Sequence, residues 1–355
     1  MTTDTAFFDK LLRIPSITQD VAACNRAVDA MREYLEARGL FCTTESLGER
    51  QFLCAATAPG KVHDYLFNAH LDVVPAPERM FEPRAEGGKI FGRGVSDCKG
   101  NAVAIAQTLC ALAGKASAGA VFTTDEETGG DTTAEAVRLG YGAHKLIAVI
   151  DANPYTVTIA QKGIFNLWLK AGGKSVHSSR PWLGENAIDN LVDGYARLRA
   201  AWKVNAPGPD GDIWFDSFAP TICQAGTVHN RVPDEAKMLL NIRYTRYGDE
   251  DRIEKFVREA SGLDTERHGI WPPFCCDENS PALAALKAAL ERTWPDRPIG
   301  FTKMTGATDA RHFAGMGVPI AILGCDGGEE HTDGEWLRTD SIGEMAGMLS
   351  IFILH

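Results

Sequence analysis

The sequence lacks the features that mark membrane, exported or nucleic-acid-binding proteins. No apolar run approaches the roughly 18 residues that a membrane-spanning helix needs. The first residues include Asp4, Asp9 and Lys10 and are not followed by the apolar core of a signal peptide. A formal net charge of -11 offers no general basic surface for nucleic acid. We therefore expect a cytoplasmic protein with neither a membrane nor a nucleic-acid partner.

The sequence also lacks any sign of a disulfide framework. Its nine cysteines include no C-x-x-C pair, and their number is odd. This pattern predicts free, mostly buried thiols in a reducing compartment. We interpret the adjacent Cys275 and Cys276 as packing residues. Internal repeats and low-complexity segments are absent as well.

What the chain does contain is enough apolar material for two domains. Its 355 residues exceed one ordinary domain, and 45% hydrophobic with 23% charged residues is typical of a globular protein with a large core. Alternating strands and helices predict an α/β domain, an open mixed sheet with helices on both faces. The expected strands are 51–57, 65–69, 120–124, 146–150 and 318–323, and the expected helices are 6–14, 20–38, 101–112, 132–139, 281–293 and one that begins near 341.

The pattern changes near residue 160. The strands expected beyond it are 165–170, 221–226 and 236–243, and the helices are 186–202 and 250–260. This β-α-β-β-α order predicts an inserted α+β domain, ferredoxin-like, at residues 161–268. Residues 1–160 and 269–355 would form a discontinuous first domain, to which the Pro-rich bend 269–274 returns the chain.

Polar side chains follow several expected strands of the first domain. His70 and Asp72 follow one strand and leave an extended chain on the same face, which suits a metal-binding imidazole held by a carboxylate. The other polar residues at such positions are Glu126, Glu127, Asp151 and His331, with Asp97 on a Gly-rich loop. Functional groups of open α/β sheets gather beyond the carboxyl ends of the strands, so we expect these residues to converge. Each of these residues, considered alone, has a simpler interpretation: a histidine of this kind can be a hydrogen-bonded core residue, and an acid can be solvated surface charge.

Two histidines and three carboxylates, one of them bridging, give each of two divalent cations about two private ligands. Mixed imidazole and carboxylate ligands favour Zn²⁺, with Co²⁺ or Mn²⁺ as substitutes. The side chains of Glu126 and Glu127 point in different directions. One can therefore bind metal while the other acts as a general base.

Five motifs connect these residues to a known family. They are His70-x-Asp72-Val-Val-Pro, Gly92-Arg-Gly-Val-Ser-Asp97-Cys-Lys-Gly100, Asp125-Glu126-Glu127-Thr-Gly-Gly130, Gly173-Lys-Ser-Val-His177-Ser-Ser and His331-x-x-x-Glu335. In order and spacing, they resemble the signatures of the acetylornithine deacetylase / succinyl-diaminopimelate desuccinylase / carboxypeptidase family of co-catalytic zinc hydrolases. The resemblance extends through essentially the whole chain.

The resemblance implies a role for each metal-site residue. Asp97 would bridge the two ions, His70 and Asp151 would complete one site, and Glu127 and His331 would complete the other. Its further implications are that Glu126 is the general base, that Asp72 orients His70, that Glu335 steadies the His331 loop, and that the peptide bond after Asp97 is cis.

The resemblance also implies a homodimer in which the inserted domain is a lid and dimerisation domain. His177 would reach into the partner subunit's site and stabilise the tetrahedral oxyanion. The substrate contacts that it implies are Asn230 and Arg243 at the substrate carboxylate, Gly306 and Thr308 in the loop that lines the pocket, and Lys162 where an acyl-group carboxylate would be read. A structural ion pair is the alternative for Arg243 and for Arg311.

Two positions depart from the family pattern. Cys98 stands where Met is usual, a swap suited to a buried apolar side chain. Asp151 stands where deacylases typically carry Glu, and Asp is more common among aminopeptidase- and dipeptidase-like members. We expect hydrolysis of N-acyl-L-amino acids, acetylornithine-like compounds first, because the compact length and the segment 161–164 look most like that branch. A dipeptidase or aminopeptidase is the alternative, and a catalytically silent binding protein is a third reading.

Overall fold

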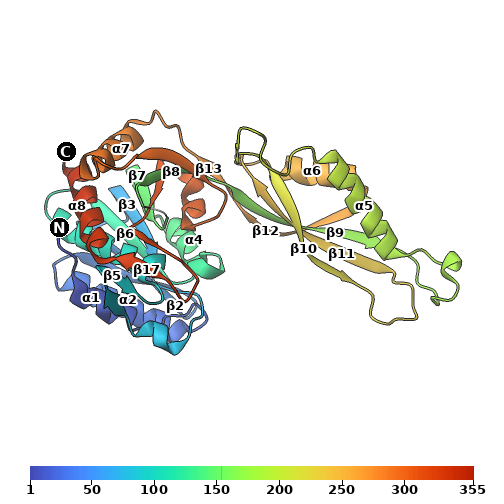
Figure 1. Cartoon of the computed structure of the whole chain (residues 1–355), viewed down its shortest axis with the longest axis horizontal. Helices are drawn as coiled ribbons and strands as arrows, with labels where there is room; N and C mark the ends of the chain where they lie inside the picture. The colour runs from blue at the N-terminus through green and yellow to red at the C-terminus, as the bar shows by residue number, and fades with distance from the viewer. Residues whose placement is uncertain (153) are drawn as a thin grey trace. The chain divides into compact units, whose positions relative to one another are not determined.

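The computed structural model describes residues 1–152 and 154–355 and contains two compact units (Figure 1). Unit 1 comprises Met1–Ala160, Cys276–Thr302 and Thr308–His355. Unit 2 comprises Gln161–Cys275 and Lys303–Ala307. Each unit has its own hydrophobic core. Among the described residues, every helix is too short or too polar to cross a membrane.

Unit 1 is built on a mixed β-sheet. Its strands are β1 (Phe41–Leu47), β2 (Arg50–Ala56), β3 (Val62–His70), β6 (Ala118–Thr123), β7 (Gly142–Ile150), β8 (Thr156–Gln161), β14 (Gly300–Met304) and β15 (Ile320–Leu323). They follow the order β1-β2-β6-β3-β7-β15-β8, and β14 also pairs with β8. The central strands β6, β3, β7 and β15 are parallel, whereas β1 and β2 extend the sheet with antiparallel pairs. The predicted open mixed sheet is confirmed.

Helices cover both faces of this sheet (Figure 1). They are α1 (Thr5–Leu12), α2 (Val21–Glu36), α3 (Gly100–Leu112), α4 (Asp131–Arg138), α7 (Pro281–Thr293) and α8 (Thr339–Leu354). All except α4 share one core with alternate strand residues such as Leu146, Ala148 and Ile150 of β7. Ile147 and Val149 are buried too, and they point to the opposite face, where α4 and the 3-10 segment η5 (Asp309–Met316) contact the strands.

Unit 2 is a four-stranded antiparallel sheet with two helices. Its elements in chain order are β9 (Gly163–Gly172), α5 (Ala187–Ala201), β10 (Ser217–Ala225), β11 (Glu235–Tyr244), α6 (Glu250–Ser261) and β12 (Asp264–Trp271). The sheet order β10-β11-β9-β12 with this β-α-β-β-α-β sequence is ferredoxin-like, as predicted. Phe165, Leu167 and Leu169 of β9 alternate towards the helices and pack against Leu191 and Val257.

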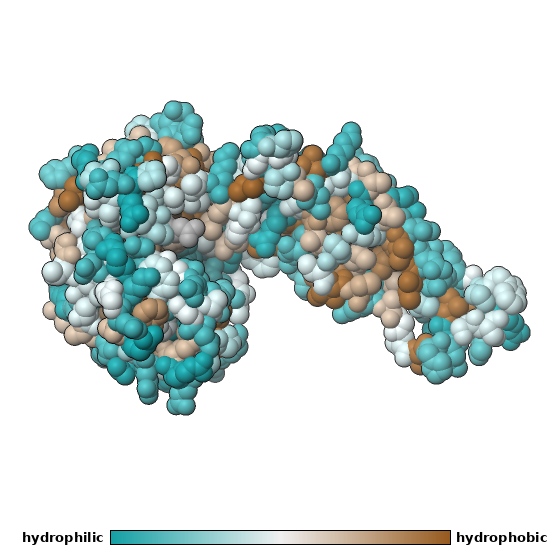
Figure 2. All heavy atoms as spheres, in the orientation of Figure 1, coloured by the Kyte–Doolittle hydropathy of each residue, from teal (hydrophilic) through white to brown (hydrophobic). Residues whose placement is uncertain are grey.

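Hydrophobic side chains also reach the surface of unit 2. Figure 2 shows them over the helical side of this unit. Trp182 is 75% exposed, and Val192 on α5 is 54% exposed. Edge strand β10 is mostly exposed as well. Apolar surface next to an open sheet edge is typical of a protein–protein interface.

Several elements depart from the sequence predictions. Strands β1 and β8 were not predicted, because β1 is a polar, mostly exposed edge and β8 reads as an isolated short run. Residue 269, where the predicted bend begins, lies inside β12. The strand register shifts between Arg267 and Gly269, and a glycine at such an irregularity is easily mistaken for part of a turn. The two-residue strand β13 (Phe274–Cys275) follows it. The cysteines are free as predicted, but fewer than half are buried: Cys24, Cys54, Cys98 and Cys325. Cys275 is exposed, so the packing interpretation fits Cys276 alone.

A third, small sheet was also absent from the sequence predictions. Its strands are β4 (Arg84–Glu86), β5 (Lys89–Phe91), β16 (Gly327–Gly328) and β17 (Trp336–Arg338), in the order β16-β17-β5-β4. Strands of two or three residues are too short to display an alternating pattern. The pairing of β5 with β17 brings the loop that follows Phe91 beside the loop that precedes Trp336.

Candidate metal centre

The predicted metal-site residues come together at one edge of the parallel sheet. His70 is the last residue of β3, and Asp151 directly follows β7. Glu126 and Glu127 lie in the 3-10 turn η3 (Glu126–Thr128) just beyond β6. Since β3, β6 and β7 are parallel neighbours, their carboxyl ends meet at this edge. The convergence expected from the strand-end positions is therefore observed for these residues.

Asp97 lies between the two histidines. Its Oδ1 atom is 2.8 Å from His70 Nε2, and its Oδ2 atom is 3.0 Å from His331 Nε2. His331 Nε2 is also 3.2 Å from Glu127 Oε2, and His70 Nε2 is 3.8 Å from Asp151 Oδ1. Two donors bound to one tetrahedral zinc ion at about 2.0–2.2 Å each lie somewhat more than about 3 Å apart. The four separations, 2.8–3.8 Å, lie on either side of that value, and the donor types on each side of Asp97 suit one divalent cation per side.

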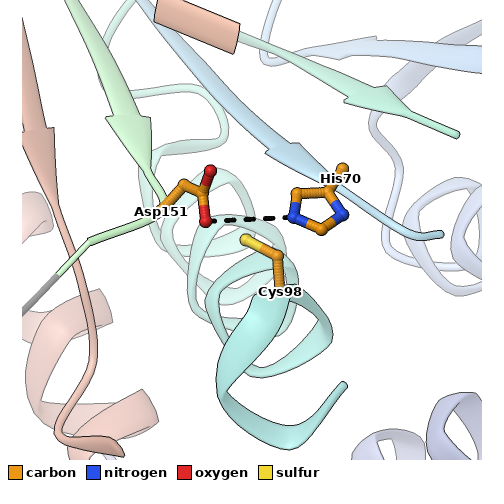
Figure 3. A group of neighbouring side chains, drawn as sticks. All are labelled: His70, Cys98 and Asp151. Atoms are coloured by element: carbon orange, nitrogen blue, oxygen red, sulfur yellow. Dashed lines mark ion pairs between the residues drawn. The ribbon is translucent and has the colours of Figure 1, made fainter. Parts of the chain in front are cut away.

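The same region contains a sulfur donor. The ligand atoms of His70, Cys98 and Asp151 all lie within 4.8 Å of one another (Figure 3). A second group, His70, Asp97 and Glu127, meets the same limit. The Asp97–Cys98 peptide bond is cis, as the resemblance implied. Cys98 is fully buried, but its neighbours are metal-ligand types, which its interpretation as apolar packing did not anticipate.

Asp72 connects His70 to the pair of glutamates. His70 Nδ1 is 3.3 Å from Asp72 Oδ1 and 2.9 Å from the Asp72 carbonyl oxygen. The Asp72 carboxylate also accepts the backbone N–H groups of Glu126 and Glu127 at 3.3 and 3.4 Å. Thr18, which the sequence analysis missed, donates its hydroxyl to Asp72 Oδ2 at 2.9 Å. Besides orienting the imidazole, Asp72 thus fixes the backbone that carries both glutamates.

Glu335 holds the loop that carries Asp97. Its carboxylate accepts the backbone N–H groups of Gly94, Ser96 and Asp97 at 3.0–3.1 Å. Arg93 forms a buried ion pair with it at 2.6 Å and donates to the Thr332 carbonyl in the His331 loop (329–335) at 3.2 Å. The expected steadying of the His331 loop by Glu335 therefore includes Arg93, which the sequence analysis missed although it lies inside the Gly92–Gly100 motif.

The pKa values of the site residues are shifted, because several buried carboxyl groups lie close to one another and to two imidazoles. Burial raises the pKa of Glu127 and of Asp151 to about 7 each. Burial also opposes ionisation of Asp97, but hydrogen bonds from His331 and His70 outweigh it and lower the pKa of that carboxyl. The hydrogen bond to Asp97 raises the pKa of His331 to about 9. Divalent cations would supply the positive charge that this cluster of acids attracts.

Glu126 stands apart from the metal-binding atoms. Neither donor group found among the described residues includes it. Its side chain is 12% exposed, and Arg311 Nη2 lies 3.9 Å from its Oε1 atom. Burial, together with the nearby charges of Asp151 and Asp309, raises the pKa of Glu126. A carboxylate with a raised pKa beside a metal cluster is suited to accept and release a proton.

The predicted substrate-binding residues are divided between the units. Lys162, Asn230, Arg243, Gly306 and the proposed oxyanion donor His177 belong to unit 2, whereas Thr308 belongs to unit 1. Within unit 2, Arg243 Nε donates to Asn241 Oδ1 at 3.1 Å, and the Asn230 carbonyl accepts the Ser178 amide at 2.9 Å. In unit 1, Thr308 Oγ1 caps η5 by accepting the Ala310 amide at 3.2 Å. Their contacts with substrate remain predictions.

A cluster of histidines and carboxylates at the carboxyl edge of a parallel α/β sheet is typical of a metal-dependent hydrolase. The chain belongs to Peptidase family M20/M25/M40, whose sequence pattern matches residues 66–355. It is 26% identical to a succinyl-diaminopimelate desuccinylase of Stenotrophomonas maltophilia over 96% of this chain and 95% of that protein. A probable succinyl-diaminopimelate desuccinylase of Staphylococcus aureus is also 26% identical, over 72% of this chain and 75% of that protein.

Solved structures share the fold. Aminopeptidase PepT from Bacillus cereus superposes with a TM-score of 0.80 at 20% identity, covering 99% of this chain and 97% of that one. An M20 metallo-carboxypeptidase, Sso-CP2 from Sulfolobus solfataricus, gives a TM-score of 0.78 at 15% identity, covering 100% and 99%. The chain is therefore a hydrolase of the M20 metallopeptidase family, and the predicted family resemblance is confirmed.

Proposed function

We propose that this protein hydrolyses the amide bond of N-acyl-L-amino acids and that it uses two bound divalent cations to do so. Zn²⁺ is the cation we propose first. The observation that carries the proposal is the position of Asp97, whose two carboxylate oxygens face His70 on one side and His331 on the other. Asp151 extends the first side and Glu127 the second. Such a bridging carboxylate is what a dinuclear centre requires.

When bound, the two ions would polarise the scissile carbonyl and make a water molecule acidic enough to attack it. In our proposal Glu126 takes the proton from that water and delivers it to the leaving amine. Its raised pKa suits both steps, because the carboxylate must hold the proton between them. Asp72 keeps Glu126 in position through the backbone N–H that it accepts.

His177 is the proposed donor to the tetrahedral oxyanion. Its Nδ1 atom accepts the Ser179 backbone amide at 3.2 Å. With Nδ1 occupied as an acceptor, the neutral ring carries its proton on Nε2. An exposed Nε2–H group is able to donate to an oxyanion. We propose that it does so in the partner subunit of a homodimer, and the apolar surface and open strand edge of unit 2 support such an association.

The choice of N-acyl amino acids rests on two observations. The relatives that cover nearly the whole chain are named for removing a succinyl group from an amino acid. Unit 2 also carries the cations Lys162 and Arg243, and Lys162 is buried with its Nζ atom 4.5 Å from the Phe215 ring centroid. A carboxylate on the substrate would offset the cost of keeping the Lys162 cation buried. A dipeptidase is the second candidate, favoured by Asp151 in place of Glu.

A substrate panel with purified, zinc-loaded protein tests the proposal. The panel contains N-acetyl- and N-succinyl-amino acids, including acetylornithine and succinyl-diaminopimelate, against matched dipeptides. We expect kcat/KM for the best acyl amino acid to exceed that for the best dipeptide by at least about tenfold, a difference of about 1.4 kcal/mol in transition-state binding. The reverse order would assign a dipeptidase. Absence of turnover with two zinc ions bound would instead assign a binding protein.

A further inference from the structure

We propose that Cys98 is a metal ligand, so that the ion held by His70 and Asp151 also binds sulfur. The inference rests on the proposed function, since it requires a metal ion at that position. It goes beyond it by assigning a donor that the family pattern does not supply, because Met is the usual residue here. The resulting centre would be asymmetric, with sulfur, nitrogen and oxygen donors on one side and only nitrogen and oxygen donors on the other.

The first support is the convergence of three side chains from three separate elements. His70 ends β3, Asp151 follows β7, and Cys98 belongs to the turn η2 (Val95–Lys99). Figure 3 shows the thiol, the imidazole and the carboxylate directed towards one another. Their ligand atoms lie within 4.8 Å of one another, a spread that one cation bonded to all three would accommodate.

The second support is the environment of the sulfur atom. Asn101 directs an amide N–H at Cys98 Sγ, with Nδ2 3.6 Å from sulfur. Asn101 is itself held in place, because its Nδ2 also donates to the Ser96 carbonyl at 3.0 Å and its Oδ1 accepts the Cys325 amide at 2.9 Å. An N–H donor aimed at a buried sulfur is the type of outer-sphere contact that orients a ligand and stabilises a thiolate.

The third support is the position of the sulfur atom next to the other ligand. Cys98 Sγ lies 3.0 Å from the carbonyl oxygen of Ile150, the residue that precedes Asp151. The sulfur atom therefore lies beside the backbone that carries Asp151. Aspartate is one methylene shorter than the glutamate that deacylases typically carry at this position, and a sulfur ligand on the same side would supply a further donor beside the shorter arm.

Coordination would change the state of the thiol without any redox step. The S–H bond breaks, its proton leaves to solvent, and the sulfur electron pair forms the bond to the metal ion. The hydrogen bond to the Ile150 carbonyl is given up, whereas the contact from Asn101 remains. A thiolate would favour Zn²⁺ over the harder Mn²⁺ at this position.

The opposing reading is that Cys98 stays a protonated thiol that only fills space. X-ray absorption fine structure at the zinc edge, on wild-type protein reconstituted with two zinc ions per chain, separates the two readings. We expect a sulfur scatterer at about 2.3 Å beside nitrogen and oxygen at about 2.0–2.2 Å. A shell of nitrogen and oxygen alone around two bound ions would overturn the assignment of Cys98 and leave the proposed function intact. Failure to bind zinc would contradict both.

Variants give the second test. In the Co²⁺-loaded protein we expect a thiolate-to-cobalt charge-transfer absorption that is lost in Cys98→Ala and in Cys98→Met. Cys54→Ala is the matched control, because Cys54 is another buried thiol of unit 1, located on β2, and its variant should keep the band. Retention of the band in a folded Cys98 variant would overturn the proposal. Absence of the band from the folded, Co²⁺-loaded wild-type protein would overturn the proposal without any variant.

Discussion

At the scale of single residues, the adjacent residues Glu126 and Glu127 have different surroundings. Glu127 Oε2 lies 3.2 Å from His331 Nε2, among the donors. Glu126 lies outside the donor groups and near Arg311. The backbone N–H groups of both residues are fixed by one carboxylate, that of Asp72. Neighbouring acids of the same type are therefore expected to respond differently to the same substitution.

Glu126→Gln should lower kcat by about 10²–10⁴-fold, because the amide cannot transfer the proton that the carboxylate transfers. Its zinc content should stay at that of the wild type. Glu127→Gln is the matched comparison, and it should lose zinc as well as activity because a metal ligand is removed. Turnover assays and elemental analysis on the same samples measure both effects. Loss of zinc in Glu126→Gln would show that the two roles have been exchanged.

The buried pair of Arg93 and Glu335 is a second residue-scale test. Glu335→Gln should destabilise the protein by about 3–5 kcal/mol, because it leaves Arg93 as an uncompensated buried charge. It should also weaken zinc binding by about 10–100-fold, since the Asp97 loop loses its support. Asp333→Asn is the control, because Asp333 lies in the same loop as His331 but forms an exposed ion pair, with Arg79. Loss of that ion pair should cost less than about 1 kcal/mol of stability. Denaturant unfolding and chelator competition measure the two effects.

How far the site was predictable depends on the kind of contact. His70, Asp151 and Glu127 follow strands, so the strand-end rule and the motifs together locate them. Thr18, Arg93 and Asn101 each contact a residue distant in the sequence, and single polar residues of this kind form no pattern that would reveal such a contact. Cys98 was located but interpreted as packing, because the sequence does not show which way its side chain points.

At the scale of elements, the carboxyl ends of β7 and β15 must approach closely for Asp151 to reach the site. Asp151 N–H donates to the Leu323 carbonyl at 2.7 Å. A Cβ atom added to Gly324, the next residue, would lie 1.5 Å from the backbone oxygen of Ala152. Only glycine fits at this contact, because backbone rather than a flexible side chain occupies the space.

Gly324→Ala should therefore displace the segment that carries Asp151. We expect a loss of stability of about 1–3 kcal/mol from overpacking, and weakened binding of the ion on the His70 side with the other ion retained. Gly300→Ala is the matched control in unit 1, since an added Cβ there meets nothing within 4 Å. Thermal unfolding and zinc titration test this expectation, and wild-type affinity at both sites in a folded Gly324→Ala would contradict it.

Elements were predictable from the sequence in proportion to their length and periodicity. The apolar stripe of α2 and the continuous apolar run of β7 locate these elements to within a few residues. The third sheet escaped prediction because its strands are only two or three residues long and because β17 pairs with β5, which lies far away in the chain. That sheet nevertheless positions the candidate site, because β5 and β17 pair next to the loops that contain Asp97 and His331.

At the scale of the whole molecule, metal binding should be coupled to pH. A raised histidine pKa means that the folded, metal-free chain keeps the imidazole proton at neutral pH; for His331 the pKa is about 9. A metal ion must displace that proton, so its affinity falls as the pH falls. Between about pH 8 and pH 6 the apparent zinc Kd should rise about tenfold per pH unit for each proton displaced. Calorimetric titrations in buffers of different ionisation enthalpy count the protons, and a Kd that does not change over this range would contradict the expectation.

The homodimer and the role of His177 can be tested together by subunit complementation. His177→Ala should lose activity with its zinc intact, and Glu126→Gln should be inactive for its own reason. If His177 acts in the partner's site, a mixed dimer contains one complete site, in which the His177→Ala subunit supplies Glu126 and its partner supplies the histidine. Random mixing of equal amounts should then restore about a quarter of the wild-type activity, because about half of the dimers are mixed and each has one working site. Co-refolding or co-expression of tagged subunits, with each variant alone as the control, measures the recovery. If His177 acts within its own chain, mixing restores nothing, since no dimer then contains a site with both residues.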